Sequence, residues 1–108
     1  MNKNINIAII GLGQIGIYLY NELKTKRDDI YKKTGKKINI IGISAKNKDK
    51  KRRFKIDKKI FYSNPLKLIK QKNIDILFEC IGLSDGISKK IVESALKNKI
   101  NVITPNKA

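Results

Sequence analysis

Short apolar runs alternate with amphipathic segments along most of the chain. The run from Ile5 to Ile10 is mostly apolar and stops at Gly11, which is typical of a strand buried on both faces of a sheet. The pattern then changes to a helical period, which predicts an amphipathic helix over about residues 14–33 that ends near Gly35. The apolar face of this helix carries Ile15, Leu19, Leu23 and Ile30.

The later part of the chain continues the alternation. Asn64 and Pro65 are typical of a helix N-cap followed by proline at the first helical position, and they predict a short helix to about residue 72. The further predicted elements are strands at 38–43, 60–62, 75–81 and 101–103, a polar loop at 46–59, a turn-rich loop at 82–86, and a helix whose apolar stripe is Ile87, Ile91, Ala95 and Leu96.

Strands that alternate with helices at these lengths imply parallel pairing through right-handed crossovers. The predicted fold class is therefore α/β, with a doubly wound parallel sheet. A chain of 108 residues fits one domain and is too short for two full-sized cores. We expect residues 1–108 to form a single domain.

A glycine-rich turn joins the first predicted strand to the first predicted helix, and this is the context that a dinucleotide-binding fingerprint requires. In that fingerprint Gly11 permits the tight turn, Gly13 lets the pyrophosphate approach the backbone, and Gly16 lets the helix pack closely on the strand. The helix N-terminus adds free N–H groups and a partial positive charge. The turn predicts a Rossmann-like NAD(P)-binding domain, and the alternative is a turn without a ligand. The predicted cofactor contacts in the turn are Gly11, Leu12, Gly13, Gln14, Ile15 and Gly16.

The end of the second predicted strand bears on the choice between NAD and NADP. In NAD-binding domains an acid at this place accepts hydrogen bonds from the ribose 2′-hydroxyl. Residues 43–47 contain no acid, and Ser44 and Lys46 offer a hydroxyl and an ammonium group. An ammonium group attracts a 2′-phosphate, which an acid would repel. NADP is therefore the predicted cofactor, with NAD as the second choice, and Lys46 and Ser44 are predicted to bind the 2′-phosphate. The alternative is that Lys46 belongs only to the basic loop.

Three residue types dominate the composition, with 22 Lys, 21 Ile and 11 Asn among 108 residues. The chain has 25 basic and 9 acidic residues and a formal net charge of +16, but only 3 of the basic residues are Arg. Arg is the residue best suited to bidentate phosphate contacts, so the excess of Lys indicates compositional drift. The composition favours a solvated basic surface over a nucleic-acid partner.

Several classes of chemistry are excluded by the residues that the chain lacks. With one Cys and no His, it offers no internal disulfide, no Cys/His zinc set and no His-based triad, and no metal site is predicted. Cys80 is expected to be a small core residue and Asp85 a turn or capping residue, whereas the role of Glu79 stays open. Neither an apolar run of about 18 residues nor a signal-peptide pattern occurs, so we expect a soluble, cytoplasmic domain.

Two further motifs extend the dinucleotide pattern. The sequence IG at residues 81–82 and SDG at 84–86 follow the fourth predicted strand, and TPNKA at 104–108 follows the last. Together with the glycine-rich turn, and with GISA at 42–45 before a basic residue, they give the chain from Ile5 to Ala108 its likeness to a known family. In these motifs and their order, it resembles the N-terminal part of homoserine dehydrogenase, and the TPNK ending is particular to that family.

This resemblance implies the reduction of aspartate 4-semialdehyde to homoserine with NAD(P)H, in the biosynthesis of threonine, methionine and isoleucine. It also implies that Lys107 is catalytic, close to the nicotinamide and the substrate. A crowded lysine can relay a proton or polarise a carbonyl. The further residues that the resemblance places at the cofactor are Ile81, Gly82 and Thr104, together with Lys107.

Homoserine dehydrogenases continue into a substrate-binding and dimerising region that is absent from these 108 residues. The resemblance therefore implies a fragment, truncated before that region, which binds the cofactor but does not turn over substrate alone. The full-length protein is expected to be a homo-oligomer without membrane association. The alternative function is a free-standing nucleotide-binding regulatory module whose basic loop docks on an anionic partner.

Overall fold

The computed structural model of the chain describes residues 3–71, 73–81 and 86–104, which form five strands and four α-helices. The strands are parallel and are ordered β3-β2-β1-β4-β5, so the predicted doubly wound α/β fold is confirmed. In chain order the elements are β1 (Lys3–Ile10), α1 (Gln14–Thr25), α2 (Arg27–Thr34), β2 (Lys36–Ser44), a 3-10 turn η1 (Lys58–Ile60), β3 (Phe61–Tyr62), α3 (Pro65–Gln71), β4 (Ile76–Glu79), α4 (Gly86–Lys97) and β5 (Asn101–Ile103).

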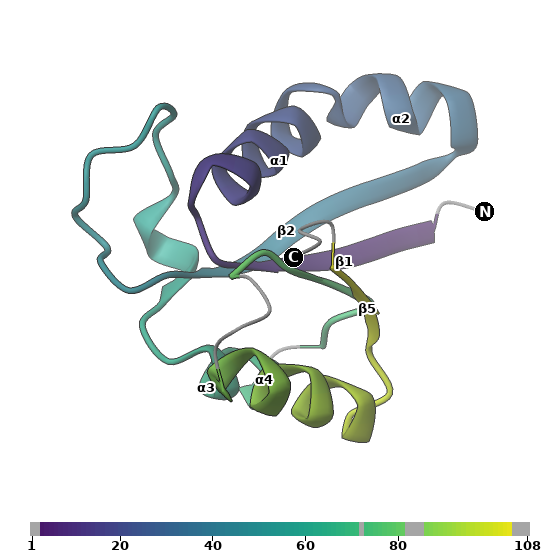
Figure 1. The fold of residues 1–108 in the computed structure, drawn as a ribbon. Coiled ribbons are helices and arrows are strands. Elements are labelled where there is room, and N and C mark those ends of the chain that lie inside the picture. Colours follow the sequence, from purple (N-terminus) through teal and green to yellow (C-terminus); the bar gives the residue numbers. More distant parts are fainter. Residues whose placement is uncertain (1–2, 72, 82–85, 105–108) are drawn as a thin grey trace.

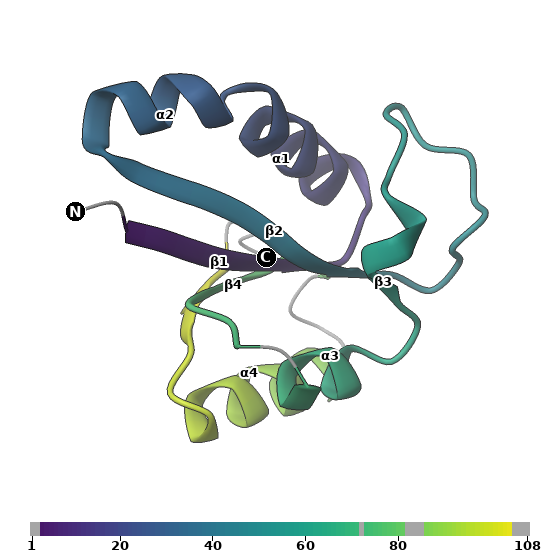
Figure 2. The same ribbon diagram turned by 180° about the vertical axis from the view of Figure 1, so that it is seen from behind.

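Helices cover both faces of the sheet, with α1 and α2 over one face and α3 and α4 over the other (Figures 1 and 2). Alternate residues of β1 point to opposite faces. Ile7 and Ile9 pack with residues of α1, whereas Ala8 and Ile10 pack with residues of α3 and α4. Burial on both faces explains why the sequence of β1 is an almost continuous apolar run.

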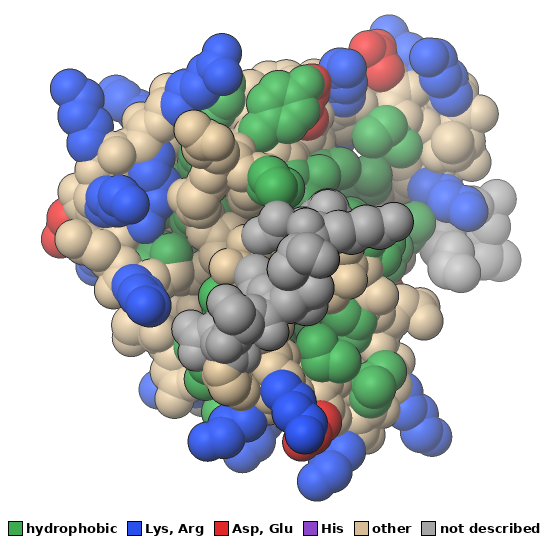
Figure 3. All heavy atoms as spheres, viewed as in Figure 1, with side chains coloured by type: hydrophobic (Ala, Val, Ile, Leu, Met, Phe, Trp, Pro, Cys, Tyr) green, Lys and Arg blue, Asp and Glu red, His purple; other side chains and the backbone are tan. Residues whose placement is uncertain are grey.

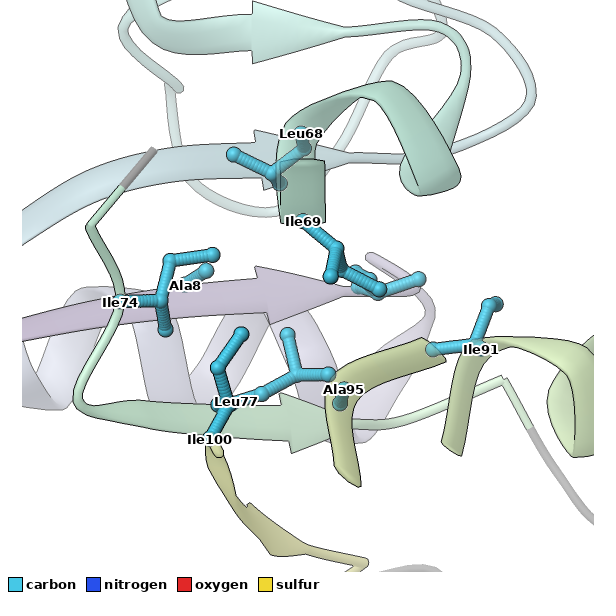
Figure 4. Packing of buried hydrophobic residues seen from close by; sticks show 9 residues of the cluster. Ala8, Leu68, Ile69, Ile74, Leu77, Ile91, Ala95 and Ile100 are labelled. Atoms are coloured by element: carbon cyan, nitrogen blue, oxygen red, sulfur yellow. The ribbon is translucent and has the colours of Figure 1, made fainter. Parts of the chain in front are cut away.

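The core beneath α3 and α4 is built from aliphatic side chains (Figure 4). Leu68 and Ile69 of α3 and Ile91 of α4 are at most 1% exposed, as is Leu77 of β4. Burying a side chain of this size contributes roughly 1.5–3 kcal/mol. This packing fixes both helices against the central strands β1 and β4, at whose carboxyl ends the loops converge.

The predicted helix over residues 14–33 is in fact two helices, and this is a correction. The helical course is broken at Lys26, whose backbone angles are φ −97° and ψ 10°. Residues 24–29 are all polar, so the chain has no apolar side chain to bury at this point. Asp28 and Asp29 in the first turn of α2 also favour a new helix start, because they complement its dipole. The predicted end at Gly35 is confirmed, since this residue caps α2 with φ 73°.

The apolar face predicted for the first helix is wrong at its start. Ile15 is 43% exposed, although it was expected on the buried stripe with Leu19 and Leu23. Because Gly16 has no side chain, α1 approaches the turn after β1 closely at this residue, so the face of α1 that carries Gly16 is buried and Ile15 lies beside it. The buried residues of α1 are Gly16, Ile17 and Tyr20.

The apolar stripe predicted for α4 also needs one correction. Leu96 is 62% exposed, whereas Ser88 is only 4% exposed. The buried positions of α4 are Ser88, Ile91 and Ala95, which recur at spacings of three and four residues. Leu96 lies beside this face and not on it, because one further residue rotates the helix by about 100°.

The predicted strand at 101–103 is confirmed as β5, and the other strand boundaries differ from the prediction by at most two residues. The N-cap at Asn64 is confirmed, because its Oδ1 accepts a hydrogen bond from the Leu66 backbone N–H at 3.0 Å. β3 comprises only Phe61–Tyr62, and β4 ends at Glu79, two residues before the predicted end. No helix within the described ranges is long and apolar enough to cross a membrane.

Candidate functional site

The glycine-rich turn, residues 11–16, is shaped by close backbone contacts at its start. Gly11 has φ +95°, and its N–H donates a hydrogen bond to the Ser44 carbonyl at 2.8 Å. A Cβ on Gly11 would lie 2.8 Å from both the Cys80 carbonyl carbon and the Ile81 nitrogen. Glycine is therefore required here both for the backbone conformation and for the approach of β4.

The two other glycines of the turn stand in opposite surroundings. A Cβ on Gly16 would lie 1.8 Å from the Gly11 carbonyl oxygen, so its absence brings α1 directly onto the turn. A Cβ on Gly13 would meet nothing within 4 Å. Gly13 is also the N-cap of α1, so no capping side chain bonds to the first N–H groups of this helix. The N-terminus of α1 thus opens onto free space, where its N–H groups suit an anion.

This open space is part of a cleft of about 580 Å³ at the carboxyl ends of the strands. The strand order changes direction at β1, and the crevice at such a point is where open α/β sheets bind ligands. Its volume lies within the range of small-molecule sites. The cleft is lined by Ile10, Gly11, Leu12, Gly13, Ser44, Ala45, Lys46, Asn47, Lys50, Arg52, Ser63, Pro65, Cys80, Ile81 and Ile87.

Three basic residues, Lys46, Lys50 and Arg52, line the cleft, and no acidic residue lines its described part. All three belong to the basic loop, residues 46–59, which extends from β2 beyond the sheet (Figure 2). Within the residues that the structure describes, Lys46 and Lys50 form no ion pair. Two ammonium groups are therefore available to an anion in the cleft.

The guanidinium group of Arg52 organises the beginning of the basic loop. Nη2 donates a hydrogen bond to the carbonyl of Asn47 at 2.5 Å, and Nη1 donates to the carbonyls of Lys50 at 3.1 Å and Lys48 at 3.4 Å. The Nε atom is buried and has no hydrogen-bond partner in the described part of the chain. The protein thus satisfies most, but not all, of the donors of Arg52.

The acid closest in sequence to the end of β2 is Asp49, and its carboxylate is engaged elsewhere. Oδ1 of Asp49 lies 2.9 Å from Nζ of Lys58, on the other side of the basic loop. The hydrogen bond and the charge of Lys58 lower the pKa of Asp49. Asp49 is not among the residues that line the cleft, so it does not take the place of the missing ribose-binding acid.

Glu79 ends β4, and Cys80 follows it, packed against the glycine-rich turn. Glu79 is 1% exposed, and its Oε2 accepts a hydrogen bond from the Ile81 backbone N–H at 2.7 Å, which fixes the chain where it leaves the strand. Cys80 is 7% exposed and belongs to the core, as predicted. Burial, with the charge of Glu79 as a smaller cause, raises the pKa of the Cys80 thiol to about 11. The described residues contain no group of three side chains that could hold a metal ion.

A family model described as the NAD-binding domain of homoserine dehydrogenase matches residues 11–108 of this chain. The chain belongs to this family. The homoserine dehydrogenase of Neisseria gonorrhoeae is 29% identical over 105 residues, and that of Bacillus subtilis is 26% identical over 105 residues. A crystal structure of S. aureus homoserine dehydrogenase at pH 7.0 superposes with a TM-score of 0.87 at 31% identity.

The likeness covers nearly all of this chain but only part of each relative. The matches span 97% of the chain against 24% of the length of the Neisseria and Bacillus proteins. For the S. aureus structure the shares are 99% of this chain and 27% of that chain. The chain therefore spans about a quarter of the homoserine dehydrogenases that it matches.

As a homoserine dehydrogenase NAD-binding domain, the chain brings some of the predicted site residues together and leaves others apart. Those that line the cleft are Gly11, Leu12, Gly13, Ser44, Lys46 and Ile81. Gln14 and Ile15 begin α1, Gly16 is buried behind the turn, and Thr104 follows β5, but none of these four lines the cleft. The motif residues at 82–85 and 105–108, including Gly82, Asp85 and Lys107, lie outside the described residues.

Sequence reasoning missed Lys50 and Arg52 as residues of the cleft. Both belong to a run of basic residues that the pattern identified only as a polar loop. Their positions depend on how the loop folds back toward β2, and a polar run without periodicity carries no signal for this. The one available signal was Arg itself, since only 3 of the 25 basic residues are Arg.

Proposed function

We propose that this chain forms the cofactor-binding part of a homoserine dehydrogenase, which reduces aspartate 4-semialdehyde to homoserine with NADPH in preference to NADH. The observation that carries the proposal is the open, cation-lined cleft beside the glycine-rich turn, in a chain that the family model matches over residues 11–108. The reaction is proposed from the family membership, and dinucleotide binding is supported by the cleft itself.

The surroundings of the glycine-rich turn fit a dinucleotide diphosphate. Gly13 leaves free space at the start of α1, where any larger side chain would stand in the way of a ligand. The N–H groups of the first helical turn donate toward this space and stabilise negative charge there. We assign Gly11 and Gly13 to the diphosphate, and Leu12 to the apolar wall of the cleft.

The basic rim of the cleft fits a 2′-phosphate. Lys46 lies two residues beyond the end of β2 and lines the cleft, and no carboxylate of the described lining opposes it. Ser44 also lines the cleft but is 1% exposed, so its hydroxyl makes the smaller contribution. Charge-assisted contacts to a phosphate are roughly twice as strong as neutral ones. We therefore assign the preference for NADPH chiefly to Lys46.

The bound cofactor supplies the hydride that reduces the aldehyde carbon. The protein must then deliver a proton to the carbonyl oxygen, and we assign Lys107 to this step because it stands in the TPNK motif after β5. Its ammonium group would hold the oxygen by a hydrogen bond and give up the proton as the alcohol forms. The assignments of Gly82, Thr104 and Lys107 rest on the motifs and on the family membership.

Substrate binding and homo-oligomer formation are assigned to the part of the homoserine dehydrogenases outside the matched quarter. Residues 1–108 are accordingly proposed as one NAD(P)-binding domain that binds the cofactor without turning over substrate. The alternative is a regulatory module that docks through its basic loop on an anionic partner. On the face seen in Figure 3 the Lys and Arg side chains are spread widely and do not gather in one patch.

The proposal is tested first by cofactor binding. Residues 1–108 are titrated with NADPH and with NADH, and nicotinamide fluorescence measures each dissociation constant. We expect saturable binding of both cofactors, tighter for NADPH, and no oxidation of NADPH by aspartate 4-semialdehyde. A chain that binds neither cofactor would contradict the proposal.

Turnover is tested in a chimera in which residues 1–108 replace the matching segment of S. aureus homoserine dehydrogenase. We expect it to oxidise NADPH when aspartate 4-semialdehyde is added. In that chimera Lys107→Ala should lower kcat on the order of 10²–10⁴-fold, with a smaller change in KM, if Lys107 delivers the proton. A raised KM for NADPH at unchanged kcat would limit Lys107 to cofactor binding. A regulatory module would bind NADPH but give no turnover in the chimera.

A further inference from the structure

The first part of the basic loop is wrapped around a single side chain. Arg52 donates hydrogen bonds to the backbone carbonyls of Asn47, Lys48 and Lys50. These carbonyls would otherwise be bonded by backbone N–H groups in a regular turn. Two other side-chain contacts support this stretch: Oδ1 of Asn47 accepts a hydrogen bond from the Asp49 backbone N–H at 3.0 Å, and Oδ1 of Asp49 lies 2.9 Å from Nζ of Lys58. The backbone adds only a weak contact of 3.4 Å between Lys50 and Asn47, and residues 46–51 are all exposed.

The same loop presents the ammonium groups of Lys46 and Lys50 to the cleft. Both side chains are flexible and form no ion pair in the described ranges. Where their ammonium groups can reach therefore depends on the position of the loop backbone. Lys50 lies within the segment that Arg52 holds, since its own carbonyl accepts a bond from Nη1. The position of at least this ammonium group depends on Arg52.

We infer that Arg52 is a positioning residue for the selection of 2′-phosphorylated dinucleotides: it folds the loop so that Lys46 and Lys50 bind one phosphate monoester at the rim of the cleft. The inference rests on the proposed dinucleotide site and names the residue that gives that site its selectivity. The Nε–H of Arg52 is buried and has no partner among the described residues, so the three carbonyl contacts of Nη1 and Nη2 carry its hold on the loop.

Arginine is required for this role by its shape and not by its charge. Its planar group carries five N–H donors in a fixed fork and reaches three carbonyls at once, whereas a lysine ammonium is a point charge on a flexible stem. Arg53 provides a contrast within the same loop. It does not line the cleft, it is exposed, and its guanidinium lies 5.3 Å from the centre of the Phe54 ring.

This contrast supplies a matched pair of variants, Arg52→Lys and Arg53→Lys, which both keep the net charge. NADPH and NADH are titrated against each variant and against the unchanged chain. We expect Arg52→Lys to raise the NADPH dissociation constant about tenfold and the NADH constant less than about twofold, because one well-placed charged contact is lost. Arg53→Lys should change neither constant by more than about twofold.

A double-mutant cycle with Lys50→Ala tests whether Arg52 acts through Lys50. Lys50→Ala alone should weaken the binding of NADPH and leave the binding of NADH unchanged. Adding Arg52→Lys should then lower NADPH affinity clearly less than it does in the unchanged chain. Additive losses would overturn the positioning role. Because Lys50→Ala removes no loop contact, it also decides the matter if Arg52→Lys does not fold: unchanged selectivity in Lys50→Ala would overturn the inference.

The outcomes separate this inference from the function on which it rests. If Arg52→Lys weakens both cofactors equally, or leaves the preference for NADPH intact, the inference is overturned and the dinucleotide site stands. If the unchanged chain binds NADPH and NADH equally, selection by the loop is overturned while cofactor binding is retained. If the unchanged chain binds neither cofactor, nor 2′-AMP as a probe of the phosphate site alone, the proposed function and the inference fail together.

Discussion

The glycine-rich turn and the basic loop both border the cleft, but they are held in place by different kinds of contact. In the turn the backbone packs against backbone, and a Cβ on Gly16 would lie only 1.8 Å from the Gly11 carbonyl oxygen. In the loop one long side chain, Arg52, bonds to three carbonyls, while residues 46–51 are all exposed. The turn therefore tolerates almost no added volume at Gly11 or Gly16, and the loop depends on the chemistry of a few side chains.

This difference predicts that the turn governs cofactor binding as a whole, whereas the loop governs only the choice between cofactors. The diphosphate is common to NAD and NADP, and the turn is proposed to bind it. The 2′-phosphate is present only in NADP, and it is proposed to lie against the basic loop. Variants of the two regions should therefore differ in the pattern of the loss as well as in its size.

The largest effect is expected from Gly13→Val. Its side chain would occupy the free space at the N-terminus of α1 and exclude the diphosphate, so NADPH and NADH should both bind on the order of 100-fold more weakly, as for the loss of two charge-assisted hydrogen bonds. Nothing lies within 4 Å of the new Cβ, so the free energy of unfolding should change by less than about 1 kcal/mol. Calorimetric titration measures binding, and urea denaturation measures stability. Unchanged affinity would remove the turn from the site.

Gly16→Ala should act through stability instead. Its methyl group would overlap the backbone carbonyl of Gly11, and overpacking of this kind costs about 1–3 kcal/mol. The matched control is Gly13→Ala, which adds the same methyl group three residues earlier in open space. Urea denaturation of both variants should show a clear loss for Gly16→Ala only. Equal losses would mean that the turn is not limited by the packing of α1.

The same contrast determines how much could be predicted from the sequence. The turn was located between β1 and α1 because glycines at fixed spacing have backbone requirements that the sequence itself displays. The break at Lys26 was not predicted, because the apolar period resumes at Ile30 with the spacing of a continuous helix. The apolar period alone does not register a break in the backbone when the spacing of apolar residues is kept across it.

The candidate site shows the same division. Lys46 could be predicted as a residue of the cleft because it lies within two residues of a strand end, and the end of a parallel strand is a fixed place in the fold. Lys50 and Arg52 could not, because hydrogen bonds from a side chain to carbonyls two to five residues away leave no periodic trace. The exposure of Ile15 was missed for a related reason, since the rotation of α1 follows from the close contact at Gly16.

A charge reversal in the basic loop, Lys46→Glu, should have a smaller and more selective effect than the turn variants. We expect NADPH affinity to fall about tenfold and NADH affinity to stay within about twofold, because only the 2′-phosphate meets the reversed charge. Lys48→Glu is the control and should change neither affinity by more than about twofold, since Lys48 is exposed and does not line the cleft. The loss of NADPH affinity after Lys46→Glu should shrink at high salt, because salt screens exposed charges. A loss of both cofactors after Lys46→Glu would show that the loop and the turn are not separable.

The smallest effect concerns pH, and it distinguishes the buried turn from the exposed loop. The pKa of Cys80 is raised from 9.0 to about 11, chiefly by burial beneath the turn, so the folded state disfavours the thiolate. Stability should therefore be fully present below pH 9 and should fall as the pH rises toward 11, by about 1 kcal/mol at pH 10. The pKa of Asp49 in the loop is lowered by Lys58, and its stabilising effect would be lost as the pH falls, but this pair is exposed and should contribute little.

Urea denaturation from pH 8 to 10 should show the alkaline loss of stability, and the difference between the unchanged chain and Cys80→Ala isolates it from the titration of the many lysines. An identical pH dependence in the two proteins would mean that the thiol remains free to ionise in the folded state, and that the turn is less tightly closed over β4 than its backbone contacts indicate.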